Sequence, residues 1–161
     1  MITGEEELLK LDNQLCFTLY AGSRAVTRIY RPLLERLSLS YPQYLVMLVL
    51  WEGDVVKVTD IGRKLHLDSG TLTPLLKRME SEGFITRKRS GEDERAVHIT
   101  LTEQGRNLKK KAVEVPRELF CRSGLSPDEF LSLKKTISDL IERMKATDEE
   151  DPCERKHRGK R

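Results

Sequence analysis

The feature that most restricts the fold of this chain is a change in the spacing of its apolar residues at Gly83. Before Gly83, the segments 58–67 and 71–82 have the three-to-four-residue spacing of helices, and the turn LDSG separates them. After Gly83 the spacing alternates in 84–89 and 96–102, which predicts two β-strands around SGEDER. Helix, tight turn, helix and charged hairpin follow in the order of a winged helix-turn-helix. We therefore predict a mainly α-helical fold with a small β-hairpin wing.

Two capping boxes mark helix starts in the N-terminal part. Thr3 and Glu6 have capping-box spacing, and leucines then recur every three or four residues, so a helix is predicted from about Thr3. Pro32 is expected to end or kink this helix, because proline lacks the N–H and its ring clashes with the preceding turn. Ser40 and Gln43 form a second capping box before an apolar run, which predicts a deeply buried second helix.

Two more helices are predicted to close the chain. One runs from about Glu103 to Arg122 with an interruption at Pro116, and Ser126, Pro127 and Glu129 open the other. The last helix has coiled-coil a/d spacing, which requires a partner helix. The residues in these positions are Phe130, Leu133, Ile137, Leu140 and Met144.

The segments are predicted to form one domain. Residues 1–147 make up this domain, with dimerisation helices at about 3–37 and 103–146 and the winged helix-turn-helix at about 54–102. Residues 148–161 are acidic and then basic without apolar periodicity, and we expect this tail to be disordered.

Composition excludes several classes of protein. The 161 residues carry 29 Lys and Arg against 26 Asp and Glu, so binding to nucleic acid requires a local basic patch. No apolar run reaches the about 18 residues of a membrane span, and no secretory signal opens the chain, so we expect a cytoplasmic protein without a membrane partner. Three cysteines without a CxxC pair and three scattered histidines indicate neither a metal site nor a disulfide scaffold, and no cofactor is expected.

Polar and basic side chains of the predicted second helix of the helix-turn-helix, and of the hairpin, suit DNA. An α-helix fits the major groove, where small polar side chains contact base edges and basic ones contact phosphates. The candidates are Ser69, Thr71, Thr73, Lys77 and Arg78 on the helix, and Arg87, Arg89, Asp93 and Arg95 on the hairpin. Taken alone, the hairpin is equally well interpreted as a charge-balanced loop in solvent. The preceding helix-turn-helix favours DNA.

The segment VTDIGRKLHLDSGTLTPLLKRMESEGFITRKRSGEDERAVHITLTEQG resembles the core of the MarR (multiple-antibiotic-resistance regulator) family of dimeric winged-helix repressors. The segment LDNQLCFTLYAGSRAVTRIYRPLLERLSLSYPQYLVMLVLWE resembles its organic-hydroperoxide-sensing branch. The resemblance implies a homodimer that places two recognition helices in successive major grooves of a pseudo-palindromic double-stranded operator. By motif position it assigns Asp93 and Arg95 to the wing tip, with Arg95 entering the minor groove.

Cys16 has two interpretations. It is either a small buried hydrophobe, the commoner use of an unpaired cysteine, or a thiolate that attacks a peroxide. A thiolate needs hydrogen-bond donors, and Tyr20 lies one helical turn after Cys16. The resemblance implies that Tyr30 and Tyr41 of the other subunit also donate and that Phe17 lines an apolar pocket. Ordinary interface packing is the alternative role of the tyrosines.

The resemblance also implies a resolving cysteine near the junction of the last two helices, where Cys121 lies in ELFCRSGLSPDE. Peroxide would oxidise Cys16 to sulfenic acid, and Cys121 of the opposite subunit would trap it as a disulfide that releases the operator. Cys121 without a partner at a helix end is the alternative, and Cys153 is taken to be incidental. We therefore predict a repressor that senses organic hydroperoxides and is not an enzyme. A repressor released by a small aromatic ligand, and a thiol peroxidase, are the alternatives.

Overall fold

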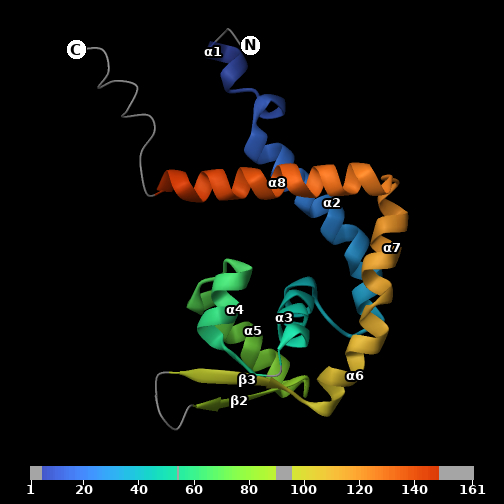
Figure 1. Ribbon diagram of the computed structural model, residues 1–161. Helices are drawn as coiled ribbons and strands as arrows, with labels where there is room; N and C mark the ends of the chain where they lie inside the picture. The colour runs from blue at the N-terminus through green and yellow to red at the C-terminus, as the bar shows by residue number, and fades with distance from the viewer. Residues whose placement is uncertain (1–4, 54, 90–95, 149–161) are drawn as a thin grey trace, which may run out of the picture. The chain divides into compact units, whose positions relative to one another are not determined.

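The computed structural model of the chain describes residues 5–53, 55–89 and 96–148 (Figure 1). The chain divides into two compact units after Arg122. The first unit contains α1 (Glu5–Leu8), the 3-10 helix η1 (Leu11–Asn13), α2 (Leu15–Glu35), α3 (Tyr41–Glu52), β1 (Val55–Lys57), α4 (Val58–Leu65), α5 (Ser69–Ser81), β2 (Ile85–Arg89), β3 (Val97–Leu101), α6 (Glu103–Ala112) and α7 (Glu114–Ser123), whose last residue falls in the second unit. The second unit contains α8 (Pro127–Asp148).

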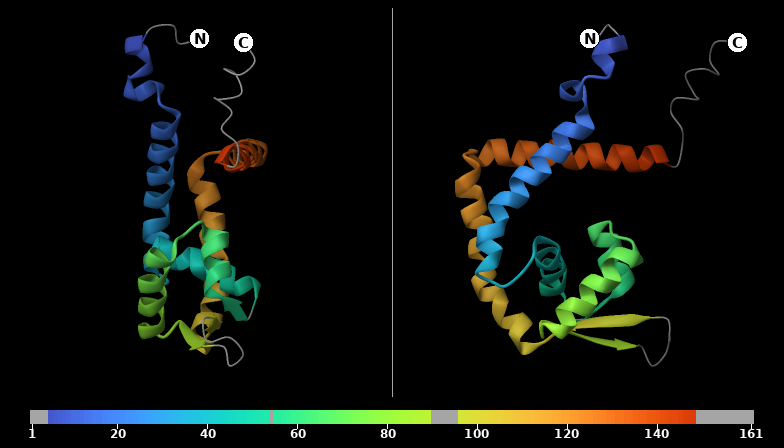
Figure 2. Two further views of the ribbon diagram at one scale, coloured as in Figure 1. Left: turned by 90° about the vertical axis from the view of Figure 1, so that its left-hand side faces the viewer. Right: turned by 180° about the vertical axis from the view of Figure 1, so that it is seen from behind.

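The core of the first unit is built around α3, which is apolar on almost every side. Val46, Met47 and Leu50 of this helix are at most 1% exposed, so the predicted deep burial of the second main helix is confirmed. Leu72, Leu76 and Met79 of α5 pack into the same core, as their helical spacing predicts. The two views of Figure 2 show α2 extending beyond the lobe that α3, α4, α5 and the sheet form.

The wing is an antiparallel sheet in the order β1-β3-β2. The two predicted strands are confirmed, each shorter by one residue at one or both ends. The sequence reading missed β1, because its three residues are too short to show an alternating pattern. Val56 pairs with Ile99 and Lys57 with His98, so the sheet has three strands instead of two. The winged helix-turn-helix fold is thus as predicted.

The start of α3 and the end of α5 follow local sequence signals. Ser40 and Gln43 form the predicted capping box at the start of α3. At the end of α5, Gly83 has φ +80°. The N–H of Gly83 donates to the carbonyl of Glu80, and the N–H of Phe84 donates to the carbonyl of Met79. This is a Schellman motif, in which glycine takes the left-handed position without steric cost.

The predicted N-terminal helix is wrong in its continuity. The backbone leaves the helix after Leu8, forms η1, and only then starts α2 at Leu15. The side-chain amide of Asn13 donates to the carbonyl of Glu7 at 2.8 Å, and that of Gln14 donates to the carbonyl of Lys10 at 3.0 Å. These bonds satisfy carbonyls that a continuing helix would use, so the two amides offer the backbone an alternative. The Thr3 half of the first capping box lies outside the described residues.

Neither Pro32, predicted to end or kink its helix, nor Pro116, predicted to interrupt one, marks the end of a helix. Helix α2 continues through Pro32 to Glu35, because Leu33 and Leu34 on the following turn are 2% and 1% exposed and hold it in the core. The break in the 103–122 segment falls at Val113, before Pro116. Pro116 therefore lies in the first turn of α7. Backbone N–H groups in this turn have no hydrogen-bond partner within the helix, so a proline there costs no hydrogen bond.

Helix α8 has the predicted start signal, since Ser126 and Glu129 bond reciprocally as a capping box. Its apolar stripe remains open within the second unit: Leu133 is 50% exposed and Met144 is 58% exposed. Among the residues that the structure describes, no helix is both long and apolar enough to cross a membrane. The predicted disorder of the tail concerns residues that, apart from Asp148 at the end of α8, lie outside the described part of the chain.

Candidate functional site

Cys16 is the second residue of α2, and its side chain is exposed. The residue before the helix, Gln14, has an extended backbone and makes no side-chain cap to the first-turn amides. Cys16 therefore lies in the first turn of a 21-residue helix, at the end where the helix dipole is positive. This end of a helix stabilises negative charge, and the thiolate is the nucleophilic form of cysteine. Sequence reasoning missed this feature because it placed Cys16 inside a continuous helix.

Tyr20 lies one turn after Cys16, but its side chain contacts Arg24, one turn further along α2. Its hydroxyl accepts a hydrogen bond from Arg24 Nη1 at 3.2 Å, and the guanidinium carbon of Arg24 lies 5.6 Å from the centre of its ring. The ring of Phe17 lies 6.5 Å from that of Tyr20. Within the described part of the chain, no group donates a hydrogen bond to Cys16 Sγ, so the predicted bond from Tyr20 to this sulfur is not formed in this structure.

Tyr30 and Tyr41 lie together in an aromatic cluster. The centres of these two rings are 5.0 Å apart, Tyr44 lies 5.8 Å from Tyr30, and Trp51 lies 6.3 Å from Tyr44. Burial, and then the neighbouring Tyr44 and Tyr41, raise the pKa of Tyr30 to about 12, and burial also raises the pKa of Tyr41 and Tyr44. These hydroxyls therefore keep their protons at neutral pH and remain hydrogen-bond donors. Tyr44 is 2% exposed and belongs to the core.

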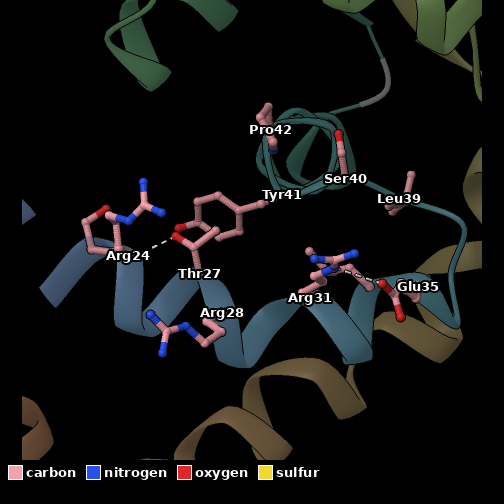
Figure 3. Close-up of a pocket in the computed structure, with 11 residues that line it drawn as sticks. Arg24, Thr27, Arg28, Arg31, Glu35, Leu39, Ser40, Tyr41 and Pro42 are labelled. Carbon is pink, nitrogen blue, oxygen red and sulfur yellow. Dashed lines mark hydrogen bonds and ion pairs between the residues drawn. The ribbon is translucent and has the colours of Figure 1, made fainter. Parts of the chain in front are cut away.

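A groove of about 750 Å³ opens between α2 and the start of α3 (Figure 3). Arginines from successive turns of α2 line one wall, and the first residues of α3 line the other. The lining residues include Arg24, Arg28, Arg31, Leu34, Leu39 and Tyr41. The sequence shows the basic residues but not the groove, which exists only because two helices meet there.

Cys121 is exposed in the last turn of α7. One turn before it, Glu118 accepts from Arg36 Nη1 at 2.8 Å and from Arg122 Nη2 at 3.1 Å. Because Arg36 follows the last residue of α2, this ion pair connects the C-terminal end of α2 to the helix that carries Cys121. Cys16 and Cys121 are both free thiols. Cys153 lies outside the described residues.

Helix α5 carries five of the residues that the sequence predicts to contact DNA. Asp68 caps the helix by accepting from the N–H and the hydroxyl of Thr71, both at 2.9 Å, and these bonds lower the pKa of Asp68. Ser69 and Thr71 are exposed, whereas Thr73 is half-buried beside Pro74. Because Pro74 lies inside α5, the carbonyl of Gly70 has no N–H partner one turn later.

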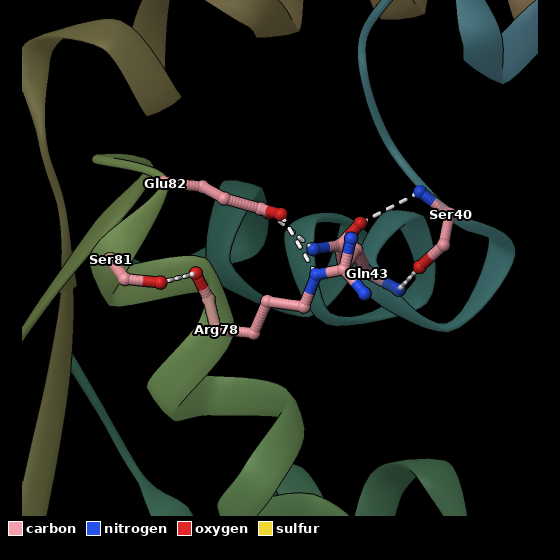
Figure 4. Close-up of polar contacts among 5 residues, drawn as sticks. All are labelled: Ser40, Gln43, Arg78, Ser81 and Glu82. Carbon is pink, nitrogen blue, oxygen red and sulfur yellow. Dashed lines mark hydrogen bonds and ion pairs between the residues drawn. The ribbon is translucent and has the colours of Figure 1, made fainter.

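The two basic residues of α5 differ in their contacts. Lys77 is exposed, whereas Arg78 Nε donates to Glu82 Oε1 at 2.9 Å (Figure 4). The other carboxylate oxygen of Glu82 accepts from the buried amide of Gln43, which also forms the cap of α3. Glu82 thus joins the ends of two helices and holds the Arg78 side chain beside them.

On the wing, Arg87 points toward α5 and Arg89 is exposed. The side chain of Arg87 is only 22% exposed, and its Nη1 lies 3.9 Å from Glu80 Oε2. Asp93 and Arg95, the predicted wing-tip residues, lie outside the described residues.

Comparisons with known proteins agree with this architecture. A sequence profile described as "Transcriptional regulator SarA/Rot" matches residues 28–112. The organic hydroperoxide resistance transcriptional regulator of Bacillus subtilis (strain 168) is 54% identical over 134 residues, which is 83% of this chain and 91% of that protein. AbfR of Staphylococcus epidermidis has a solved structure in its reduced form bound to DNA. Its sequence is 36% identical to this chain, the TM-score is 0.74, and the match covers 89% of this chain and 98% of the AbfR chain. The disulfide-formed structure of AbfR is 39% identical with a TM-score of 0.59 and covers 85% and 96%.

Proposed function

Because the chain belongs to the MarR/SarA family of winged-helix transcriptional regulators, we propose that it is a homodimeric repressor that organic hydroperoxides release from operator DNA. The family is one of regulators and not of enzymes, in agreement with the prediction from sequence. The observation that carries the proposal is the exposed Cys16 in the first turn of α2. It occurs in a chain that is 54% identical to a regulator named for organic hydroperoxide resistance.

Exposed apolar residues support the homodimer. They lie in the N-terminal part of the chain and on α8. Soluble monomers rarely expose this much apolar surface. The residues concerned are Leu8, Leu9, Leu11, Leu15, Leu19, Val26, Leu131, Leu133, Ile141 and Met144. A second copy that covers both segments accounts for them, with the helices near 3–37 and 103–146 as the dimerisation elements.

The tyrosine cluster supports the sensing step. We propose that Tyr30 and Tyr41 of one subunit donate to the Cys16 thiolate of the other, since both hydroxyls remain protonated. The thiolate attacks the terminal oxygen of the hydroperoxide, an S–O bond forms, the O–O bond breaks, and the alkoxide leaves and takes up a proton. Sulfur is oxidised by two electrons, and the hydroperoxide is reduced to an alcohol.

The resolving step is proposed for Cys121 of the opposite subunit. Its thiolate attacks the sulfenic sulfur, an S–S bond forms, and hydroxide leaves as water. The relative AbfR has both a reduced form bound to DNA and a disulfide form. This chain superposes better on the first than on the second, with TM-scores of 0.74 and 0.59. A disulfide that changes the spacing of two recognition helices accounts for release of the operator.

The DNA contacts are proposed for the exposed start of α5 and for the wing. Ser69, Thr71 and Thr73 would contact base edges, Lys77 and Arg78 phosphates, and the wing residues Arg87, Arg89, Asp93 and Arg95 the adjoining minor groove or backbone. These are the residues that the sequence pattern selects.

The proposal is tested with DNA that reduced protein selects from a random-sequence library. Operator binding is then titrated with cumene hydroperoxide for wild type, C16S and C121S, alongside non-reducing electrophoresis. We expect release from wild type with a covalent dimer, no release from C16S, and no covalent dimer from C121S. Release of C16S by the hydroperoxide contradicts Cys16 as the sensor.

A second candidate function is a repressor released by a small aromatic ligand without redox chemistry. The groove beside Tyr41 favours it, because its volume of about 750 Å³ suits a small molecule. This alternative requires release by such a ligand from protein in which all three cysteines are replaced by serine.

A further inference from the structure

Among the described residues, the only buried polar side chain is that of Gln43, which is 3% exposed. Its amide oxygen accepts the backbone N–H of Ser40 at 2.7 Å and completes the cap of α3. This bond fixes the orientation of the amide, because only the oxygen can accept a hydrogen bond. The amide N–H group therefore faces the end of α5, where it donates to Glu82 Oε2 at 2.5 Å (Figure 4). A buried amide thus connects the start of α3 to the end of α5.

The carboxylate of Glu82 follows the last residue of α5, where the helix dipole disfavours negative charge. Gln43 is the third residue of α3, where the dipole favours negative charge. Helix electrostatics alone would thus place the acid at position 43 and the amide at position 82. The observed order adds an ion pair, because Glu82 Oε1 accepts from Arg78 Nε at 2.9 Å. The arrangement therefore points to Arg78 as the side chain that this contact serves.

Glu82 holds the inner nitrogen of the Arg78 guanidinium. The side chain of Arg78 is otherwise 74% exposed, and ion pairs this open to solvent contribute little to stability. A guanidinium that is held at Nε leaves its two terminal nitrogens to donate to a phosphate, and its rotamer is fixed before DNA binds. Holding Arg78 is therefore of more use to DNA binding than to the stability of the fold.

The start of α3, at the other end of this path, carries Tyr41. Ser40 caps the helix and Tyr41 is its first residue, so the backbone that binds the Gln43 amide also carries the hydroxyl that we assign to the Cys16 thiolate of the other subunit. Oxidation of that sulfur removes the negative charge to which the hydroxyl donates. A shift of the first turn of α3 then reaches Glu82 through Gln43.

We propose that Glu82 is a positioning residue that fixes Arg78 for an operator phosphate and, through Gln43, makes the position of Arg78 depend on the start of α3. The inference rests on the proposed function, because it supplies a route from the oxidised thiol to a DNA contact. Glu82 is then an acid that strengthens DNA binding although its charge repels phosphate. An acid without this role would weaken DNA binding.

The test measures the affinity of reduced protein for the operator selected as above, at several salt concentrations. R78Q should lower the slope of log affinity against log salt by about 0.9 for each phosphate contact that is lost. E82Q should weaken binding by about threefold per subunit, the value of ordering one flexible side chain, and by about tenfold for a dimer. In the R78Q background, E82Q should have no further effect, because Glu82 acts through Arg78.

A reciprocal exchange separates the contact from the individual side chains. In E82Q the new amide oxygen can accept from Gln43 or from Arg78, but the new N–H group then faces the other donor. The double variant Q43E/E82Q supplies an acceptor at position 43 and restores each hydrogen bond of the path, so it should recover most of the affinity. The control E114Q removes an acid that pairs within α7 and should bind as wild type does. Urea unfolding checks that each variant is folded.

E82Q that binds the operator as tightly as wild type, or that loses as much affinity in the R78Q background, overturns the positioning role. The link to α3 is tested by oxidation. The ratio of operator affinities before and after cumene hydroperoxide should be about tenfold smaller in E82Q, because the reduced variant already lacks what oxidation removes. An equal ratio in the two proteins overturns this link. If cumene hydroperoxide does not release wild type, the proposed function fails, whereas the affinities of the reduced proteins still decide the role of Glu82.

Discussion

Glu80 of α5 binds Arg87 of β2 twice, accepting its backbone N–H at 3.0 Å on one carboxylate oxygen while the other lies 3.9 Å from its Nη1. Arg87 Nε is buried and has no acceptor among the described residues, so Glu80 supplies the counter-charge of a mostly covered guanidinium. One carboxylate thus fixes the last turn of the helix that we assign to the major groove against the first strand of the hairpin.

Replacing Glu80 by alanine should weaken both the fold and DNA binding. The variant leaves Arg87 partly buried without its ion pair, and we expect a loss of about 1–3 kcal/mol in the free energy of unfolding. Urea unfolding measures this loss, and operator affinity should fall with it because the hairpin is no longer held to α5. The control E114A removes an exposed acid that pairs within α7 and should change neither. Full stability of E80A would show that the contact contributes nothing.

Gly105 cannot accept a side chain. A Cβ atom at this position would lie 2.2 Å from the carbonyl oxygen of Phe84 and 3.1 Å from Leu101 Cδ2. We expect G105A to lower the free energy of unfolding by about 2–4 kcal/mol, because the start of α6 must move away from the wing. Gly22, inside α2, has no atom within 4 Å of its Cβ position, so G22A should raise stability by roughly 0.5–1 kcal/mol. Thermal unfolding of the two variants should shift in opposite directions.

Ser38 occupies a position that suits glycine better. It has φ +56°, and the N–H of Leu39 bonds to the carbonyl of Leu34 at 3.1 Å, which closes α2 with a Schellman motif. We expect S38G to stabilise the protein by about 1 kcal/mol, because a residue with a Cβ is strained in this conformation. The same change at Ser23, in the body of α2, should destabilise it. A lower denaturation midpoint for S38G would contradict the assignment of strain.

Alkaline pH should destabilise the fold through Tyr30. Its pKa is about 12 in the folded protein and about 10 when unfolded. The folded state therefore holds the proton more tightly, so the contribution to stability is complete below pH 10 and is lost as the pH rises toward 12. The slope of unfolding free energy against pH in this range should be smaller in Y30F. An equal slope in wild type and Y30F would show that Tyr30 ionises alike in both states.

Local signals predicted the parts of the fold that depend on neighbouring residues. The capping box at Ser40 and the glycine at the end of α5 act within one turn of chain, and both are where the sequence places them. The path around Pro32 depends on how deeply Leu33 and Leu34 pack, which no local pattern contains. The break before Leu15 depends on hydrogen bonds between side chains and carbonyls several residues away.

The sequence also predicts only part of the candidate site. Cys16, Tyr20 and Cys121 stand out as residue types at motif positions. The first-turn location of Cys16 is visible only once the helix boundary is known. The groove beside Tyr41 requires two helices to meet, so its arginines had no recognisable role in the sequence.

The continuity of α2 has a mechanical consequence. At 21 residues the helix is about 32 Å long, and it is a single rod with the reactive sulfur at one end and two leucines fixed in the lobe at the other. A displacement of about 3 Å at the sulfur end therefore tilts a rod of this length by about 5° about the end that the lobe holds. Chemistry at a single atom of α2 can in this way rotate the helix where it enters the lobe.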